Sequence, residues 1–146
     1  MTDVGRYTAM EAEVIAAIGT IDGVVSVEPS TSVEDLVETE GIRTPVIGVI
    51  EGESSRQGAY ALSNRRINAC SEWEVAVVVR NERGRVAARA MLRAILEKVR
   101  DNLHYASSTQ PPTARYIWKG DKRVQVEGDD LYAAVATFEL TVLLQS

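Results

Sequence analysis

The chain is 146 residues long, which suits one domain with a single hydrophobic core. Apolar residues make up 45% of it and charged residues 25%, a globular composition that excludes a wholly disordered or fibrous protein. The net charge is −5, and the single cysteine and single histidine exclude an internal disulfide and any metal site that needs several sulfur or imidazole ligands. No apolar run is long enough to span a bilayer and no signal-peptide pattern opens the chain, so we expect no membrane contact and a chain kept in a cytosol.

Hydrophobic periodicity and turn residues divide the chain into three helices and six strands. In chain order we expect a helix at 8–18, a strand at 24–27, a helix at 33–39, strands at 44–50 and 66–80, a helix at 85–104, and strands at 114–119, 123–127 and 131–144. Helices and strands do not alternate strictly. The order therefore favours an α+β fold, with a mainly antiparallel sheet packed against one long and one or two short helices.

The first half of the chain carries helix-start and turn signals. Thr8, with Glu11 three residues later, has the pattern of a capping box at the start of the first helix. Ser32 is placed to cap the second helix. The stretch GESSRQGAY is polar and glycine-punctuated, so it predicts a loop or a projecting hairpin instead of core. We therefore expect residues 1–146 to form a single α+β domain with a projecting loop or hairpin near 52–66.

In the second half of the chain, apolar and polar residues alternate more regularly. The strand at 66–80 should have one buried face and one mixed face. The buried face holds Trp73, Val75, Val77 and Val79. The mixed face holds Glu74, Ala76, Val78 and Arg80. Gly120 and Asp121 predict the turn of a hairpin. The last strand predicts one apolar side and one wet side, and the wet side holds Thr137, Glu139 and Thr141.

The helix at 85–104 is the most distinctive element. Its apolar residues recur at spacings of three and four and form one stripe that should face the sheet: Ala88, Met91, Leu92, Ile95, Leu96, Val99 and Leu103. The other side carries four arginines: Arg85, Arg89, Arg93 and Arg100. Arginines four residues apart repel one another by a few tenths of a kcal/mol, roughly. A group outside the helix that neutralises them is one interpretation, and a plainly solvated helix face is the other.

The charge is divided along the chain in a way that suggests a partner. Residues 1–60 carry a net charge of −8, residues 61–120 carry +6, and residues 121–146 carry −3. If the acidic and basic segments lie on different faces, the acidic face of one copy can meet the basic face of the next, as in a head-to-tail ring. The alternative is that both are solvated or pair within one molecule. Nucleic acid is a weaker candidate, because the chain as a whole is acidic and shows no recognised binding signature.

The residues that could act in catalysis or bind a metal ion also have structural interpretations. Cys70 fits a small, half-buried strand residue, and His104 fits a cap on the helix carbonyls. Glu72 and Glu74 share a strand face that is typically solvated. Asp129 and Asp130, with Glu127, could bind a hard cation, but they more often form a turn. We therefore expect no enzyme, no catalytic residue, no cofactor and no metal.

Three segments resemble the tail terminator, or tail-completion, proteins of tailed bacteriophages, especially those of Mu-like contractile-tailed phages. They are the opening helix MEAEVIAAI, the strand and helix WEVAVVVRNERG and RVAARAMLRAILEKVRDNL, and the final strand DDLYAAVATFELTVLL. The resemblance covers about residues 8–144. The segment SSTQPPTARYIWKGDKRVQV and residues 52–70 depart from it.

This resemblance implies a structural virion protein with a small α+β fold. Its expected place is a homo-oligomeric, hexameric ring on the head-proximal end of the tail tube, where it stops tube polymerisation and provides the docking surface for the neck and head. The implied partners are the tail tube, the sheath protein and neck or connector proteins. No sequence-specific nucleic acid is implied, although genome DNA could pass through the ring. The implied location is the virion tail, after assembly in the host cytoplasm.

Two sets of residues are the expected interface of such a ring. The first is the basic helix side, Arg85, Arg89, Arg93 and Arg100. The second is an arm ordered by partners, which includes Ser54, Ser55, Arg56, Arg65 and Arg66. Two other functions stay open: a head-completion or neck connector protein, and a cytosolic regulatory α+β domain that binds a small ligand in a closed apolar pocket.

Overall fold

The computed structural model describes residues 3–40, 44–56, 66–82, 84–126 and 130–145. It confirms the α+β class. The described elements, in chain order, are α1 (Asp3–Ile18), β1 (Ser26–Ser30), α2 (Val33–Glu40), β2 (Val46–Arg56), β3 (Arg66–Arg80), α3 (Arg85–Leu103), β4 (Ile117–Val124) and β5 (Leu131–Gln145).

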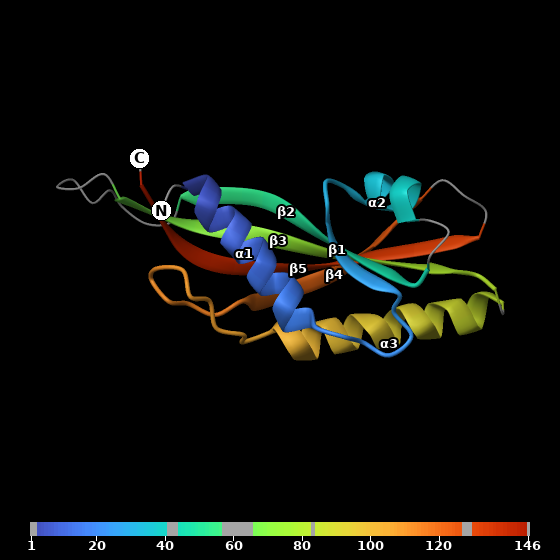
Figure 1. The fold of residues 1–146 in the computed structure, drawn as a ribbon. Helices are drawn as coiled ribbons and strands as arrows, with labels where there is room; N and C mark the ends of the chain where they lie inside the picture. Colours follow the sequence, from blue (N-terminus) through green and yellow to red (C-terminus); the bar gives the residue numbers. More distant parts are fainter. Residues whose placement is uncertain (1–2, 41–43, 57–65, 83, 127–129, 146) are drawn as a thin grey trace.

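The strands form one sheet in the order β1-β2-β3-β5-β4 (Figure 1). Among the described strands, only β1 and β2 pair in parallel, and the other neighbouring pairs are antiparallel. The central pair, β3 and β5, is in register over 15 residues, from Arg66 opposite Gln145 to Arg80 opposite Leu131. This long ladder satisfies the backbone polar groups of both strands on their shared side and determines which side chains share a face.

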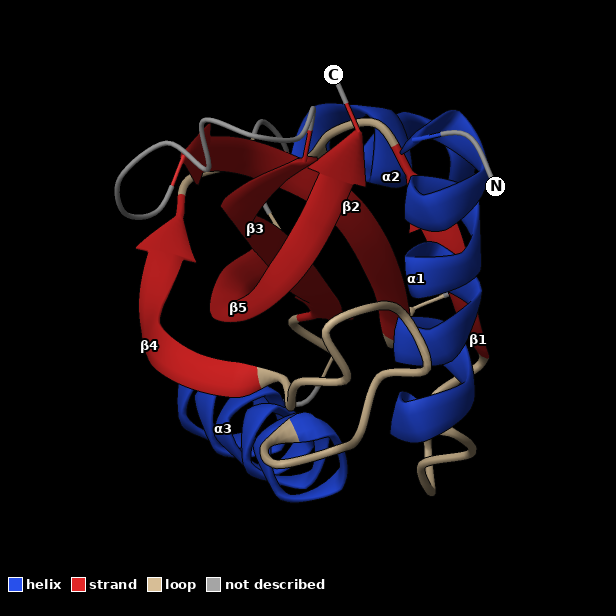
Figure 2. Cartoon of the chain, turned by 90° about the vertical axis from the view of Figure 1, so that its left-hand side faces the viewer, coloured by secondary structure: helices blue, strands red, loops and turns tan. Residues whose placement is uncertain are grey.

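The larger core lies on the face that α1 and α3 cover. Figure 2 shows α3 below the curved sheet and α1 beside it. Trp73 on β3 and Phe138 on β5 are opposite each other in the register, and both are fully buried. Met10, Val14 and Ile18 of α1 pack into the same cluster. The predicted buried face of β3 is therefore confirmed.

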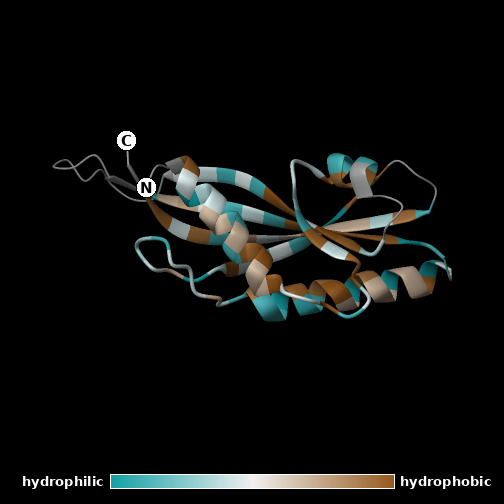
Figure 3. Ribbon diagram, viewed as in Figure 1, coloured by the Kyte–Doolittle hydropathy of each residue, from teal (hydrophilic) through white to brown (hydrophobic). Residues whose placement is uncertain are grey.

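The smaller core lies on the opposite face, under α2. Val33 and Leu36 of α2 pack with Ala76 and Val78 of β3 and with strand residues of β2 and β5. In Figure 1, α2 lies above the sheet and α3 lies below it. The alternating bands of hydropathy along the long strands are visible in Figure 3. The mixed face of β3 is thus apolar where α2 covers it and polar farther along the strand.

The first helix begins earlier than predicted. It starts at Asp3, so Thr8 lies inside it, and the Thr8 hydroxyl donates to the Val4 carbonyl oxygen at 3.0 Å. The predicted capping box at Thr8 is therefore wrong. The added turn carries Arg6, which is buried and donates to the Leu143 carbonyl oxygen at 2.8 Å. A polar residue in a buried position hid this turn from hydrophobic periodicity. The Ser32 cap is confirmed, since its Oγ accepts from the Asp35 N–H at 3.0 Å.

The edges of the sheet also differ from the predictions. β1 runs through Pro29, beyond the predicted strand at 24–27, and an edge strand tolerates proline because one side of it needs no donor. β2 extends to Arg56, which pairs with Ala69 of β3, so the described part of the predicted loop or hairpin is strand. Residues 57–65, and Arg65 with them, lie outside the described residues.

The predicted hairpin around Gly120 is wrong. β4 is one strand that pairs with β5 from Ile117 to Val124, and Gly120 follows a register shift in that pairing. Trp118 donates from its indole Nε1 to Asp121 Oδ1 at 2.9 Å, so the glycine and aspartate belong to a bulged strand and not to a turn.

The polar connection between α3 and β4 is attached to α1 by one carboxylate. Glu13 accepts hydrogen bonds from Ser108 Oγ (2.7 Å), from the Thr109 backbone N–H (2.7 Å), from Thr109 Oγ1 (2.5 Å) and from the Tyr116 hydroxyl (2.9 Å). Burial raises the pKa of Glu13, but the hydrogen bonds from Thr109, Ser108 and Tyr116 together outweigh it and the pKa is lowered. Tyr116 is buried as well, and its own burial together with the nearby Glu13 charge raises the pKa of Tyr116.

We predict that Glu13→Gln lowers the free energy of unfolding at neutral pH by about 1–2 kcal/mol, since an amide cannot accept all of these bonds. A lowered folded-state pKa stabilises the fold above the unfolded pKa, near 4.5, and that stabilisation is lost as the pH falls through the folded value. The difference in the free energy of unfolding between Glu13→Gln and wild type should therefore become smaller in acid. Urea denaturation at several pH values measures this difference. Glu11→Gln on the same helix is the control, and equal pH profiles for Glu13→Gln and wild type would contradict the assignment.

Gly52 generates a second prediction. A Cβ atom there would lie 2.9 Å from the Glu72 backbone carbonyl oxygen, at the irregular part of the β2–β3 pairing. Because the obstacle is backbone, Gly52→Ala should destabilise the fold by about 1–3 kcal/mol, while the exposed Ser55→Ala should change little. Chemical denaturation compares the two, and an unaltered midpoint for Gly52→Ala would show that the strands separate easily there.

Candidate subunit interface

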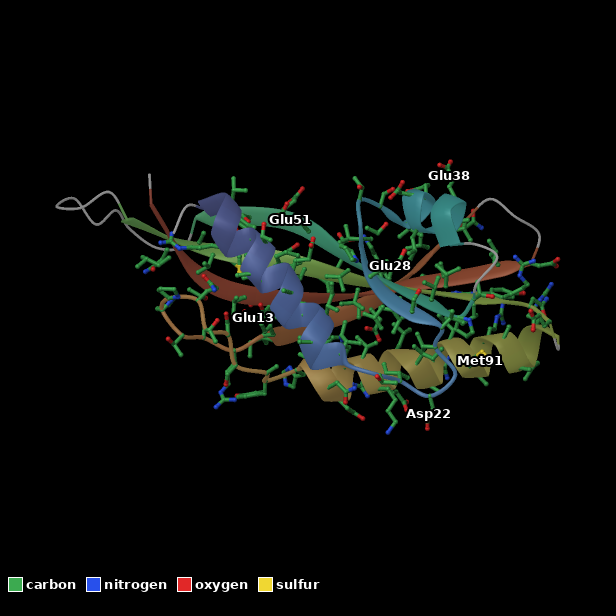
Figure 4. The ribbon with its side chains drawn as sticks, in the orientation of Figure 1. Glu13, Asp22, Glu28, Glu38, Glu51 and Met91 are labelled. Carbon is green, nitrogen blue, oxygen red and sulfur yellow. The ribbon has the colours of Figure 1, made fainter. Side chains whose placement is uncertain are left out.

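The long helix α3 has the two-sided character that its sequence predicts. Its buried residues are Ala88, Leu92, Ile95, Leu96, Val99 and Leu103, and these face the sheet. Met91 was predicted in this stripe but is 46% exposed, so that part of the prediction is wrong. Met91 lies on the flank of the helix where the loop after α1 leaves a groove open (Figure 4).

Three of the four arginines form an exposed row. Arg85, Arg89 and Arg93 are all exposed, and none of their guanidinium groups makes a hydrogen bond or ion pair with any residue that the structure describes. Glu97, four residues beyond Arg93, is exposed and does not pair with it in the described chain. The mutual repulsion of the row is therefore not relieved inside the described part of the molecule.

Arg100 has a different environment. It is only half-exposed, and its guanidinium lies 5.1 Å from the centroid of the Trp118 ring on β4. Such a contact fastens the end of α3 to the edge strand. His104, next along, was predicted to cap the helix carbonyls, and it is the C-cap residue of α3: its backbone N–H donates to the Arg100 carbonyl oxygen at 2.9 Å. Its imidazole Nδ1 does not bond a helix carbonyl but accepts from the Trp118 backbone N–H at 3.0 Å. The structure thus separates Arg100 from the exposed row.

The outward side of α3 is apolar beside the arginine row. Val86 is 84% exposed, and the small side chains of Ala87, Ala90 and Ala94 are exposed as well. A solvent-facing helix side normally carries polar residues. This apolar surface was not predicted, because the four arginines dominate the sequence pattern on the exposed side of the helix. The spacing of Val86, Ala90 and Ala94 at four-residue intervals was the signal that could have identified it.

An acidic surface lies on the other side of the sheet. Glu34, Asp35 and Glu38 of α2 are exposed, and α2 covers the face opposite to α3. Figure 4 shows Glu38 above the sheet, while α3 runs below it. For these two helices, the acidic and basic segments of the sequence therefore lie on different faces of the molecule.

The second predicted set of residues lies elsewhere. Ser54 and Ser55 are exposed on β2, and Ser54 Oγ is 2.7 Å from the Tyr7 hydroxyl oxygen of α1. Arg56 and Arg66 belong to the far ends of β2 and β3 in Figure 1, whereas α3 begins at the opposite end of the molecule. The structure does not bring the two sets together.

A polar cluster occupies the part of the sheet that α2 leaves uncovered. Glu72 and Glu139 are directly opposite each other on β3 and β5, and Lys119 Nζ lies 3.2 Å from Glu72 Oε1 and 3.3 Å from Glu139 Oε2. Both carboxylates raise the pKa of Lys119. The lysine offsets the repulsion of two like charges across the strands. The cluster is therefore a structural ion-pair network.

Cys70 belongs to the same face and is buried. Its Sγ donates to Glu139 Oε2 at 3.2 Å. Burial, the hydrogen bond to Glu139 and the Glu139 charge raise the pKa of the thiol to about 11. Such a thiol is a poor nucleophile at neutral pH.

The sequence also led us to expect no metal site and no membrane-spanning segment. Within the described ranges, no three His, Cys, Asp or Glu residues are grouped to hold a metal ion. Glu127 and Asp129 lie outside those ranges. No described helix has the length and apolar character that crossing a bilayer requires.

Two open grooves border the helices. One, of about 620 Å³, lies between the loop after α1 and α3, and Ile21, Met91 and Ala94 line it with Asp22. The other, of about 540 Å³, lies between α1 and β2 and includes Tyr7, Glu51 and Ser54. Met91 and Ala94 make the first groove continuous with the outward apolar side of α3.

Comparisons with known proteins identify the fold. No protein-family model and no curated protein matches the chain. Among solved structures, a chain described as "Virion of native gene transfer agent (GTA) particle" aligns with a TM-score of 0.61 at 16% identity, over 94% of this chain and 96% of that one. At that identity the alignment shows a shared fold along nearly the whole length of both chains.

We predict that iodoacetamide alkylates folded Cys70 at about pH 8 at least about 100-fold more slowly than it alkylates the unfolded chain. The pKa rise from 9.0 to about 11 lowers the thiolate fraction by that factor. Glu139→Gln should accelerate the reaction, whereas Glu74→Gln, on the same sheet face, should not. Intact-mass kinetics measure both, and a folded Cys70 that reacts like a free thiol would contradict the assignment.

Proposed function

We propose that this chain is a structural virion protein, a tail terminator that forms a hexameric ring on the head-proximal end of a phage tail tube. The observation that carries the proposal is the fold shared over 94% of this chain with a protein of a gene transfer agent virion. The three sequence segments that resemble tail terminators lie in α1, β3 with α3, and β5, which are the elements that supply most of the larger core.

The surface chemistry supports assembly. A row of arginines without partners in the described chain, next to an exposed apolar helix side, has the composition of an interface, because arginine and apolar side chains are both enriched there. The acidic surface on the opposite face supplies complementary charge for another copy. Contacts between two different surfaces of identical subunits generate rings when the rotation closes.

A ring of this kind has two unlike faces, and this explains how it would end a tube. One face binds the last layer of tube subunits, and the other does not reproduce the tube's binding surface, so no further layer can add. The outer face then receives neck proteins from the head. The strand ends near Ser54, Arg56 and Arg66, together with Arg65, are the proposed arm toward the tube or sheath.

The side chains that could act in catalysis have structural contacts instead. Glu13 anchors a loop, Glu72 and Glu139 pair with Lys119, and Cys70 is held protonated. Each group is engaged in a contact that stabilises the fold. The proposal accordingly assigns no reaction to them.

We predict that deleting the gene leaves tail tubes that grow to uncontrolled length and fail to join heads, because nothing ends their polymerisation. Adding the purified chain to growing tubes should stop elongation and place a ring at one tip. Negative-stain electron microscopy measures tube length and tip occupancy. Tubes of normal length together with unjoined, leaking heads would instead assign the chain to head completion or the neck connector, and normal particles would overturn a virion role.

A further inference from the structure

We propose that the arginine row of α3 in one copy docks on the acidic side of α2 in a second copy of the same chain. This contact rests on the proposed ring, but it goes beyond it by naming both surfaces. The basic surface is defined by Arg85, Arg89 and Arg93 with Val86 and Ala90 beside them. The acidic surface is defined by Glu34, Asp35 and Glu38.

The spacing of the charges matches between the two helices. Arg89 and Arg93 are four residues apart on α3, and Glu34 and Glu38 are four residues apart on α2. Four residues correspond to a rise of about 6 Å along a helix, so both pairs repeat at the same interval. Two helices laid side by side can therefore form two ion pairs at once. The planar guanidinium groups suit paired recognition of carboxylates.

Neither surface makes an ion pair with another part of the described chain. Arg85, Arg89 and Arg93 make no ion pair within the described chain, and the same holds for Glu34 and Glu38. Asp35 Oδ2 has only a long contact, 3.5 Å, with Ser30 Oγ. The sheet separates α2 from α3, so one copy cannot join its own two surfaces (Figure 1).

The apolar part of each surface adds to the match. Val86 is 84% exposed beside the arginine row, and Val37 is half-buried next to Glu34 and Glu38. Small residues such as Ala90 allow the axis of another helix to come close. Covering these side chains would remove apolar surface from water while the charges pair at the rim.

The position of the two surfaces determines the kind of assembly. Because they lie on opposite faces of the sheet, a pair of copies that uses the contact once still exposes one free surface of each kind. The contact is therefore heterologous and propagates from copy to copy until it closes. Other carboxylates of the acidic segment, such as Glu51 and Glu53, are exposed on β2, but no second pair there has the four-residue helical interval.

Two charge-reversed chains test the contact directly. Arg89→Glu/Arg93→Glu makes both surfaces acidic, and Glu34→Arg/Glu38→Arg makes both surfaces basic. Each variant alone should self-associate at least about tenfold more weakly than wild type, because every contact then joins like charges. An equimolar mixture should recover assembly, with the two chains in alternating order. Distinct tags and native mass spectrometry would show a 1:1 ratio in every closed ring, and an even number of subunits.

Controls separate this contact from net charge and from misfolding. Lys122→Glu/Arg123→Glu reverses two exposed charges on β4, so it matches the charge change of the α3 variant and should leave assembly intact. Thermal unfolding followed by circular dichroism confirms that each variant folds. Raised salt should weaken wild-type association, because the pairs lie near the surface.

The outcomes separate the contact from the function. Wild-type rings with no recovery in the mixture, or equal loss in the β4 control, would overturn the α2–α3 contact and leave the ring intact. A wild-type chain that stays monomeric at every concentration would overturn the contact, whether or not it caps tubes. Normal tail length without the gene would overturn the function, whatever the mixture shows.

Discussion

The pairing of β3 with β5 over 15 residues is the constraint on which the remaining structure depends. Once these two strands are in register, alternate residues must point to opposite faces. Trp73 and Phe138 then define the face that α1 and α3 cover, and Ala76 and Val78 define the face that α2 covers. The two helices with opposite surface charge are separated by the sheet for this reason.

This separation links the fold to the proposed assembly. A chain with its acidic and basic helices on the same face could neutralise itself, and its surface charges would be satisfied in a monomer. Here the sheet prevents that, and in the proposed contact a second copy supplies the carboxylates that relieve the repulsion among the arginines of α3. The exposed Val86 beside them would add an apolar contribution to that proposed contact.

Three polar side chains outside the two charged surfaces connect parts of the fold to each other. Glu13 joins the connection before β4 to α1, and Lys119 joins two opposed carboxylates across β3 and β5. Arg100 fastens the end of α3 to Trp118. Glu13 and Arg100 thus connect helices to neighbouring segments, and Lys119 connects β4 to β3 and β5.

The sequence by itself determined the α+β class, the alternation of β3 and β5, the apolar stripe of α3 and the Ser32 cap. These depend on spacings of two to four residues, which local periodicity reveals. Only the tertiary structure decided that β4 is one bulged strand, that α1 begins before Thr8, and that Arg100 contacts Trp118 instead of lying in the exposed arginine row. The partners of Glu13 lie about a hundred residues away in the chain, and the opposite positions of α2 and α3 follow from strand order. Contacts of that kind depend on the path of the whole backbone, which no local pattern encodes.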